Sequence, residues 1–404
     1  MQRKSVRNTP KDLQRVVMMT IEYKKRPITI IDRTFTSISH VNSKLHSPYT
    51  PLERAQLRDL VKMLIRVGVD IFEINQRTVS FMQELHGFPL AYRFEDDYQY
   101  NARQSNDYGI EDIIKNCQYL IIPYHIAGFF IQEHHLSEHH LFAQLTQRYR
   151  NKIIIECNVA NFQKLQVILM SDQWRSISRQ YTIDVLRIRG LSQIAVPFLT
   201  DEISQIRELV QCSIDWCPCN SSYSATAITI EALDYTVDSI STHFNGGISD
   251  TVTDTTTPLE EIIMAIHYLK QPKGIRPDYS VFPDITALYE SLTGDRINGM
   301  KPIIGKDIFK YESGIHADGI AKNHATYEPY APEVVGNIRE LYIGKHSGMK
   351  SLTSFMEKWK ISITHDQSKA LLQSIRAFSV NYKRNVREEE LFYLCHSILK
   401  SHPS

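Results

Sequence analysis

The chain has 404 residues, with 46 Lys and Arg against 45 Asp and Glu and a formal net charge of +1. This balance excludes the global electrostatic field that draws a protein to nucleic acid or to an anionic membrane. Hydrophobic residues make up 42% of the chain and charged residues 23%, as in folded globular proteins, and no apolar run reaches the roughly 20 residues of a membrane span. Six cysteines do not form a disulfide framework in a chain of this length, so we expect reduced thiols and a cytoplasmic protein.

Residues 1–26 are interpreted as an N-terminal extension. They contain eight basic residues but neither the apolar core nor the cleavage site of a secretory signal. We expect a partly mobile segment with a short helix around residues 13–21.

Residues 27–285 alternate short apolar runs with amphipathic stretches, a pattern typical of βα units around a parallel sheet. A strand at 28–31 is followed by Thr50-Pro51, where a capping box with Glu53 begins a helix that ends at Gly68, and a second strand follows at 69–74. Further strands are predicted at 119–123, 152–157, 184–188, 213–216 and 237–242. The count and the alternation predict an α/β fold, the (β/α)8 TIM barrel.

Functional side chains of such a barrel gather at the carboxyl ends of the strands. Residues 32–40, 73–75, 217–220 and 245–253 would therefore meet at one mouth. Arg187 alternates with apolar neighbours, as does Arg189, so both lie on one face of a strand. That face is either the lumen, where an arginine could meet a carboxylate substrate, or the side that faces the helices.

The sequence changes character after the predicted barrel. Residues 286–348 are rich in Gly, Pro and Asp and read as a linker subdomain, and residues 349–404 read as a C-terminal subdomain of two or three amphipathic helices. The chain ends soon after Lys350, so we expect no large regulatory domain.

Ordered motifs in the linker carry a resemblance. They are Glu312-Ser313-Gly314-Ile315-His316-Ala317-Asp318-Gly319-Ile320, Tyr327-Glu328-Pro329 and Ile343-Gly344-Lys345-His346-Ser347-Gly348. Together they resemble the homocitrate synthase and 2-isopropylmalate synthase family, whose HMG-CoA-lyase-like barrel condenses acetyl-CoA with a 2-oxo acid such as 2-oxoglutarate. The barrel agrees more weakly, and the short tail is similar to the homocitrate synthase type without a leucine-binding domain.

The resemblance implies roles for individual residues. His316 and Tyr327 match the residues assigned to proton transfer, and Glu73 matches the acid that positions the reacting groups. We assign substrate binding to Asp32, Glu312 and Arg187. The alternatives are a linker that merely keeps its shape and, for Glu73, a structural ion pair.

The resemblance also implies an assembly. In this family the linker of one subunit covers the barrel mouth of its partner, so we expect a homodimer or a hetero-oligomer with a catalytically competent homologue. His316 would then act in trans. The family serves amino-acid or organic-acid biosynthesis, and neither nucleic acid nor membrane is expected as a partner.

The family's divalent metal, Mg, Mn or Zn, has lost its expected ligands in this sequence. The motif arginine falls on Thr36 and the metal acid on Ser37, the two metal histidines fall on Cys217 and Cys219, and the last metal asparagine falls on Thr253. A metal and an arginine each contribute several kcal/mol to such a transition state, so we expect little turnover by the chain alone.

Cysteine offers another ligand set. Thiolates of Cys217 and Cys219 could hold zinc with Cys157 or His243, whereas the alternative is two small buried side chains at a strand end.

Three functions remain open at this point. The chain is a homocitrate synthase-like acyltransferase or the metal-site-degenerate subunit of one, a divergent barrel enzyme that uses Cys217 and Cys219, or a non-catalytic ligand-binding or regulatory homologue.

Overall fold

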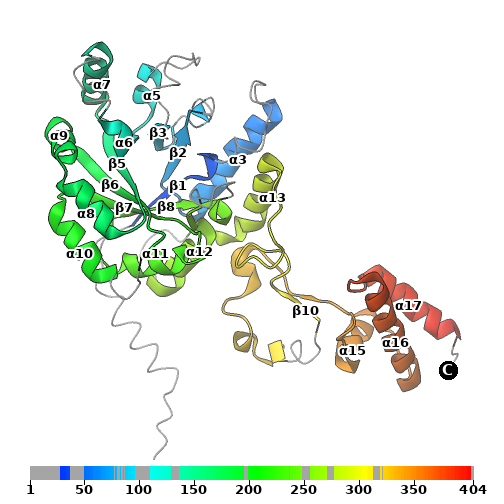
Figure 1. Ribbon diagram of the computed structural model, residues 1–404. Helices are drawn as coiled ribbons and strands as arrows, with labels where there is room; N and C mark the ends of the chain where they lie inside the picture. Colours follow the sequence, from blue (N-terminus) through cyan, green and yellow to red (C-terminus); the bar gives the residue numbers. More distant parts are fainter. Residues whose placement is uncertain are drawn as a thin grey trace, which may run out of the picture. The chain divides into compact units, whose positions relative to one another are not determined.

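The structure is a computed structural model. It describes residues 28–36, 50–76, 78, 79, 82, 85, 87–95, 110–128, 136–194, 199–235, 237–247, 255–270, 277–312, 319, 320 and 322–401, with only the backbone at 136–141, 200, 270 and 401. The helix expected at 13–21 lies outside these residues. The chain forms two compact units, one of residues up to 278 with 284–296, the other of 279–283 with 297–404 (Figure 1).

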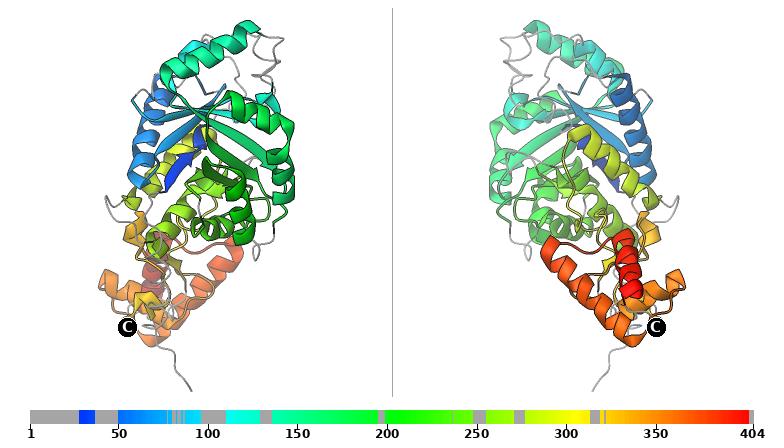
Figure 2. Two further views of the ribbon diagram at one scale, coloured as in Figure 1. Left: turned by 90° about the vertical axis from the view of Figure 1, so that its left-hand side faces the viewer. Right: turned by 90° about the vertical axis from the view of Figure 1, so that its right-hand side faces the viewer.

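The first unit is a closed barrel of eight parallel strands surrounded by helices (Figures 1 and 2). Strand β1 pairs with both β2 and β8 and so closes the ring, and the short β9 adds to β8. The strands are β1 (Thr29–Asp32), β2 (Ile71–Asn75), β3 (Leu90–Arg93), β4 (Tyr119–Pro123), β5 (Lys152–Val159), β6 (Ile183–Gly190), β7 (Ser213–Pro218), β8 (Ser239–His243) and β9 (Thr257–Pro258). The predicted TIM barrel is confirmed.

Strand β3 was not predicted from the sequence. Its four residues, Leu-Ala-Tyr-Arg, are too few to show a period and follow directly after Pro89. Strands β5 and β6 also run further than predicted, and the added residues include the polar Asn158 and Arg189, which interrupt the apolar pattern.

Helix α3 (Pro51–Val67) shows why the predicted βα units form. The hydroxyl of Thr50 accepts from the backbone N–H of Glu53, and the Glu53 carboxylate accepts from the N–H of Thr50 at 2.7 Å. The helix ends at Gly68, whose φ of 110° favours glycine. Both predicted ends are confirmed.

The remaining helices of this unit follow the strands in turn. They are α5 (Ile110–Asn116), α6 (Tyr124–Ala127), α7 (Leu136–Tyr149), α8 (Phe162–Met170), α9 (Asp172–Gln180), α10 (Leu199–Leu209), α11 (Ala225–Leu233), α12 (Leu259–Ala265) and α13 (Phe282–Thr293), whose last residues belong to the barrel unit. No helix within the described ranges is long and apolar enough to cross a membrane.

The lumen is built in layers of inward side chains. The first layer is apolar and contains Ile31, Ile71, Ala91, Ile121 and Ile154, with Val185 packed against it. Successive inward positions on a strand are two residues apart. The next layer therefore holds Arg33, Glu73, Arg93, Glu156 and Arg187, and it is charged.

The second unit combines an irregular linker with a helical end. Strands β10 (Lys310–Tyr311) and β11 (Glu340–Leu341) pair in parallel. Helices α15 (Met349–Trp359), α16 (His365–Tyr382) and α17 (Glu388–Ser401) enclose an apolar core, so the predicted helical end contains three helices. Ile343, from the last linker motif, belongs to this core and bridges to Val386.

Candidate active site

A lattice of arginines and carboxylates fills the charged layer of the lumen. Arg187 on β6 binds Asp215 through Nε at 2.5 Å and Glu73 through Nη1 at 2.6 Å, and all three side chains are wholly buried. Glu73 lies on β2, so Arg187 reaches across the barrel. Its side chain therefore faces the lumen, and the alternative of the helix side is excluded.

Glu156 on β5 is the second junction of the lattice. It accepts from Arg93 at 2.7 Å, from Arg189 at 3.2 Å and from Arg187 at 3.5 Å. Burial alone would raise the pKa of Glu156, but the arginines, led by Arg93, hold it well below the usual value. Glu156 is therefore ionised throughout the neutral range.

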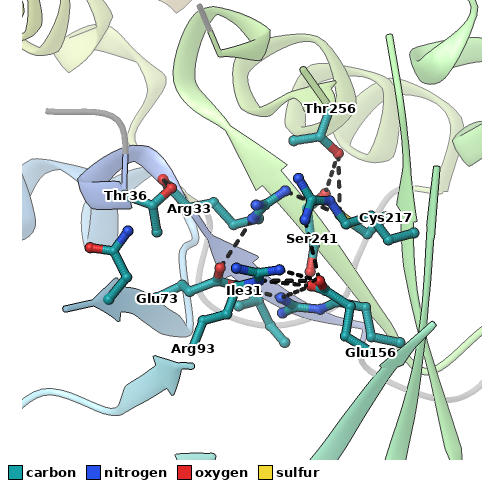
Figure 3. Close-up of polar contacts among 12 residues, drawn as sticks. Ile31, Arg33, Thr36, Glu73, Arg93, Glu156, Cys217, Ser241 and Thr256 are labelled. Atoms are coloured by element: carbon teal, nitrogen blue, oxygen red, sulfur yellow. Dashed lines mark hydrogen bonds and ion pairs between the residues drawn. The ribbon is translucent and has the colours of Figure 1, made fainter. Parts of the chain in front are cut away.

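Arg33 follows directly after β1 and connects the lattice to Cys217. It is 7% exposed, its Nε donates to Glu73 Oε1 at 3.2 Å, and its Nη1 lies 3.4 Å from Cys217 Sγ. Figure 3 shows Arg33 between Glu73 and Cys217. Although burial would raise the pKa of Glu73, Arg187 and Arg33 keep it below the usual value. Glu73 thus holds two guanidinium groups.

Asp32 has a different environment from the acids of the charged layer. It is wholly buried, and its carboxylate accepts from the N–H of Thr34 at 3.0 Å and from the Thr34 hydroxyl at 2.9 Å. The Thr34 hydroxyl in turn accepts from the N–H of Phe244. Burial raises the pKa of Asp32 to about 7 in spite of these bonds. Asp32 therefore links β1 to the end of β8 through Thr34. Its carboxyl group is partly protonated near neutrality.

The described residues do not fit the divalent metal that the resemblance implies. Cys217 Sγ has Arg33 and, at 3.6 Å, Thr256 Oγ1 as neighbours, while Cys219 Sγ contacts Ser221 Oγ at 3.2 Å. A guanidinium beside a thiol repels a second cation at that point. Among the described residues no three His, Cys, Asp or Glu side chains are grouped to hold a metal.

Neither of the suggested third zinc ligands is grouped with Cys217 and Cys219 among the described residues. Burial raises the pKa of the Cys157 thiol far above its usual value, and zinc needs a thiolate. The Nδ1 of His243 lies 2.5 Å from the carbonyl oxygen of Phe244, and burial lowers its pKa to about 4. The other expected ligand positions, Ser37 and Thr253, lie outside the described residues.

In the second unit the structure joins the first and last linker motifs. Glu312 Oε1 accepts from the N–H of His346 at 2.7 Å, and Ser347 Oγ donates to the Glu312 carbonyl at 3.2 Å. The predicted substrate ligand Glu312 therefore already braces the loop of residues 344–348. His316 lies outside the described residues.

The adjacent residues Tyr327 and Glu328 of the Tyr-Glu-Pro motif have different environments. Glu328 is buried, receives Arg339 at 2.8 Å and accepts from the Tyr311 hydroxyl at 3.1 Å. Tyr327 is 42% exposed, and its ring packs against Gly319, where any side chain would collide with it. Glu328 fixes the loop, and Tyr327 is partly exposed.

Sequence reasoning singled out Glu73 and Arg187 but missed their partners. Arg33, Arg93, Glu156 and Asp215 are all buried members of the lattice. The sequence feature that could have identified them is a charged residue inside an apolar strand, because such a residue needs a buried partner. Thr36, which takes the place of the motif arginine, donates its hydroxyl to the Arg33 carbonyl at 2.8 Å.

Comparison with known proteins gives the following relatives. Residues 303–383 match the family described as homocitrate synthase post-HMGL domain-like. The chain is 32% identical over 375 residues to the homocitrate synthase omega subunit of Clostridium pasteurianum, covering 92% of this chain and 96% of that protein. It is 31% identical over 224 residues to 2-isopropylmalate synthase 2 of Caldanaerobacter subterraneus, covering 55% and 57%.

Among solved structures, hydroxymethylglutaryl-CoA lyase from Pseudomonas aeruginosa superposes with a TM-score of 0.50. The two chains are 10% identical, and the match covers 70% of this chain and 97% of the other. At this identity the likeness concerns the barrel fold alone.

Proposed function

The chain belongs to the homocitrate synthase and 2-isopropylmalate synthase family, and from this premise we propose that it is a subunit of a homocitrate synthase-like acyltransferase. The reaction would condense acetyl-CoA with a 2-oxo acid such as 2-oxoglutarate. In the proposed assembly the metal-dependent chemistry takes place in the barrel of a competent homologue. This chain contributes its linker to that partner's mouth.

The contact between Arg33 and Cys217 carries the proposal. It places a permanent cation at 3.4 Å from the Cys217 thiol, which the resemblance aligns with a metal histidine of the family. Both side chains are buried, so water cannot screen the charge. A barrel arranged in this way is unsuited to the family's metal-dependent condensation.

The linker supports the other half of the proposal. Glu312 binds the loop at 344–348 and Glu328 binds Arg339, so the linker motifs are held in place. Tyr327 is partly exposed. The relative that matches over 92% of this chain is named a subunit, which also favours an enzyme of more than one chain.

The chemistry required of the linker is proton transfer. A base takes a proton from the methyl group of the acetyl thioester, the resulting carbanion attacks the oxo carbon, and the new alkoxide takes up a proton. Water then hydrolyses the thioester of the product, which breaks the C–S bond and releases CoA as the free thiol. We assign the proton transfers to His316 and Tyr327. An imidazole has an unperturbed pKa of about 6.5 and can act as base or acid near neutrality.

The test measures release of the CoA thiol by the purified chain, by a metal-competent homologue, and by the two together. We expect background activity from this chain alone and a faster rate from the mixture. In the mixture, His316→Ala should lower the rate by about 10² and leave assembly intact.

The matched control is His324→Ala, because His324 is an exposed histidine of the same linker. It should change the rate less than about twofold. Robust turnover by the chain alone would refute the subunit role, and a mixture unaffected by His316→Ala would favour the non-catalytic regulatory homologue.

A further inference from the structure

The ring of Tyr327 lies against a glycine of the first linker motif. A Cβ atom at position 319 would stand 2.5 Å from Tyr327 Cε2, 3.0 Å from its Oη and 3.1 Å from its Cζ. Nonbonded carbon atoms rest about 3.5–4.0 Å apart, so a side chain at position 319 and the ring in its present place exclude each other. The phenol end of Tyr327 therefore occupies the space that such a side chain would take.

The backbone at position 319 does not itself require glycine. The φ of Gly319 lies outside the left-handed region, and residues 319 and 320 have helical backbone. Alanine is a better helix former than glycine, so the local conformation would favour alanine. The three atoms nearest to the missing side chain all belong to Tyr327. The requirement for glycine therefore comes from the tyrosine ring.

Hydrogen bonds hold the backbone on both sides of this contact. The Gly319 carbonyl accepts from the N–H of Asn323 at 2.9 Å, and the N–H of Tyr327 donates to the His324 carbonyl at 3.0 Å. Glu328, the next residue, donates its N–H to the same carbonyl at 2.9 Å. The Tyr327 side chain is partly exposed, so its ring can move outward without entering the core. A side chain added at position 319 therefore displaces the ring and leaves this backbone in place.

We infer that Gly319 is a positioning residue: its backbone, free of a side chain, packs against the Tyr327 ring and sets the place of the phenol for proton transfer. The proton transfer rests on the proposed function, whereas the placement of the ring rests on the contact alone. Relief of the collision moves the ring by at least about 1 Å, and a displacement of that size lowers a rate by up to about 10²-fold.

The first experiment follows the ring in the full chain without any partner. Tyr327 is replaced with 3-fluorotyrosine, and its fluorine resonance is recorded by NMR. We expect Gly319→Ala to shift the resonance by more than its linewidth while the circular dichroism spectrum stays unchanged. The matched control is Gly348→Ala, because a Cβ at position 348 would meet nothing within 4 Å and its φ of −110° suits any residue. The control should leave the resonance in place.

The second experiment measures CoA thiol release by the full chain mixed with a metal-competent homologue. Gly319→Ala should lower kcat roughly 10- to 100-fold and leave the KM for acetyl-CoA within about twofold, since the phenol moves and the assembly does not. Gly348→Ala should change neither. In a Tyr327→Ala chain there is no ring to displace, so adding Gly319→Ala should lower kcat no further.

The Tyr327→Ala background also guards against misfolding. If Gly319→Ala alone lowers the melting temperature, the loss should disappear in the double variant Gly319→Ala/Tyr327→Ala, because the colliding ring is gone. A fluorine resonance that stays in place in a folded Gly319→Ala chain, an unchanged kcat, or an equal loss of kcat or stability in both backgrounds would each overturn the inference.

The proposed function fails in a different way. A mixture that responds to His316→Ala but not to Gly319→Ala keeps the subunit role and overturns the inference. A mixture without activity removes the subunit role and with it the proton transfer by Tyr327, while the fluorine resonance still decides whether Gly319 places the ring.

Discussion

Replacing Asp32 with asparagine should change how the stability of the barrel depends on pH. The pKa of Asp32 is about 7 in the folded chain against an ordinary value of 3.8. Between these values the unfolded chain releases a proton that the folded chain keeps, so the free energy of unfolding falls as the pH rises. At 1.36 kcal/mol per pKa unit the loss is roughly 4 kcal/mol, of which about 3 kcal/mol falls between pH 5 and pH 8.

An asparagine side chain carries no titrating proton, so Asp32→Asn should gain about 3 kcal/mol relative to the parent chain between pH 5 and pH 8. The lowered pKa of His243 acts in the opposite direction, but it is present in both proteins and cancels in the comparison. The parent should carry Trp359→Phe, because the remaining tryptophans, Trp174 and Trp216, both belong to the barrel unit.

The assay is urea unfolding at both pH values, followed by tryptophan fluorescence. A difference between variant and parent that is the same at pH 5 and pH 8, within about 0.5 kcal/mol, would show that Asp32 does not carry the raised pKa.

Three other predictions concern the metal, the lattice and the second unit. Metal analysis after dialysis should find well under one divalent ion per chain, and a stoichiometric ion lost on Cys217→Ser would instead establish a thiolate site. Arg187→Met should destabilise the barrel by about 3–5 kcal/mol in urea, because it removes the cation that buried Asp215 binds and one of the two that Glu73 binds, whereas exposed Arg175→Met should stay within about 0.5 kcal/mol. Gly336→Ala should lower the melting temperature of the second unit, measured by circular dichroism, because Gly336 has a φ of 71° and a Cβ there would collide with the Ser280 carbonyl; an unchanged temperature would contradict this reading.

The fold could be predicted from the sequence because it depends on local signals. Apolar runs at strand length, the capping box at Thr50 and the helix stop at Gly68 each act within a few residues, and their order requires a parallel sheet. The strand at Leu90–Arg93 was not predicted, because four residues are too few to show the alternation of apolar and polar side chains.

The site could be predicted only in part, because it depends on distances across the barrel. Glu73 and Arg187 were both recognised, yet nothing in the sequence joins them, and the structure places them 2.6 Å apart. Counting along the motif placed the expected arginine at Thr36. The guanidinium that reaches Cys217 comes from Arg33, three residues earlier, and only the turn after β1 reveals it.

The lattice also decides how the strands align with one another. A slip of one residue on β6 would turn Arg187 toward the helices and bring Leu186 into the lumen, leaving Glu73 and Asp215 without their shared cation. Breaking one buried ion pair costs about 3–5 kcal/mol, and a slip would break several, against a total stability of roughly 5–15 kcal/mol for a domain. Apolar side chains tolerate such shifts far better. The charged layer therefore selects one register for the closed barrel.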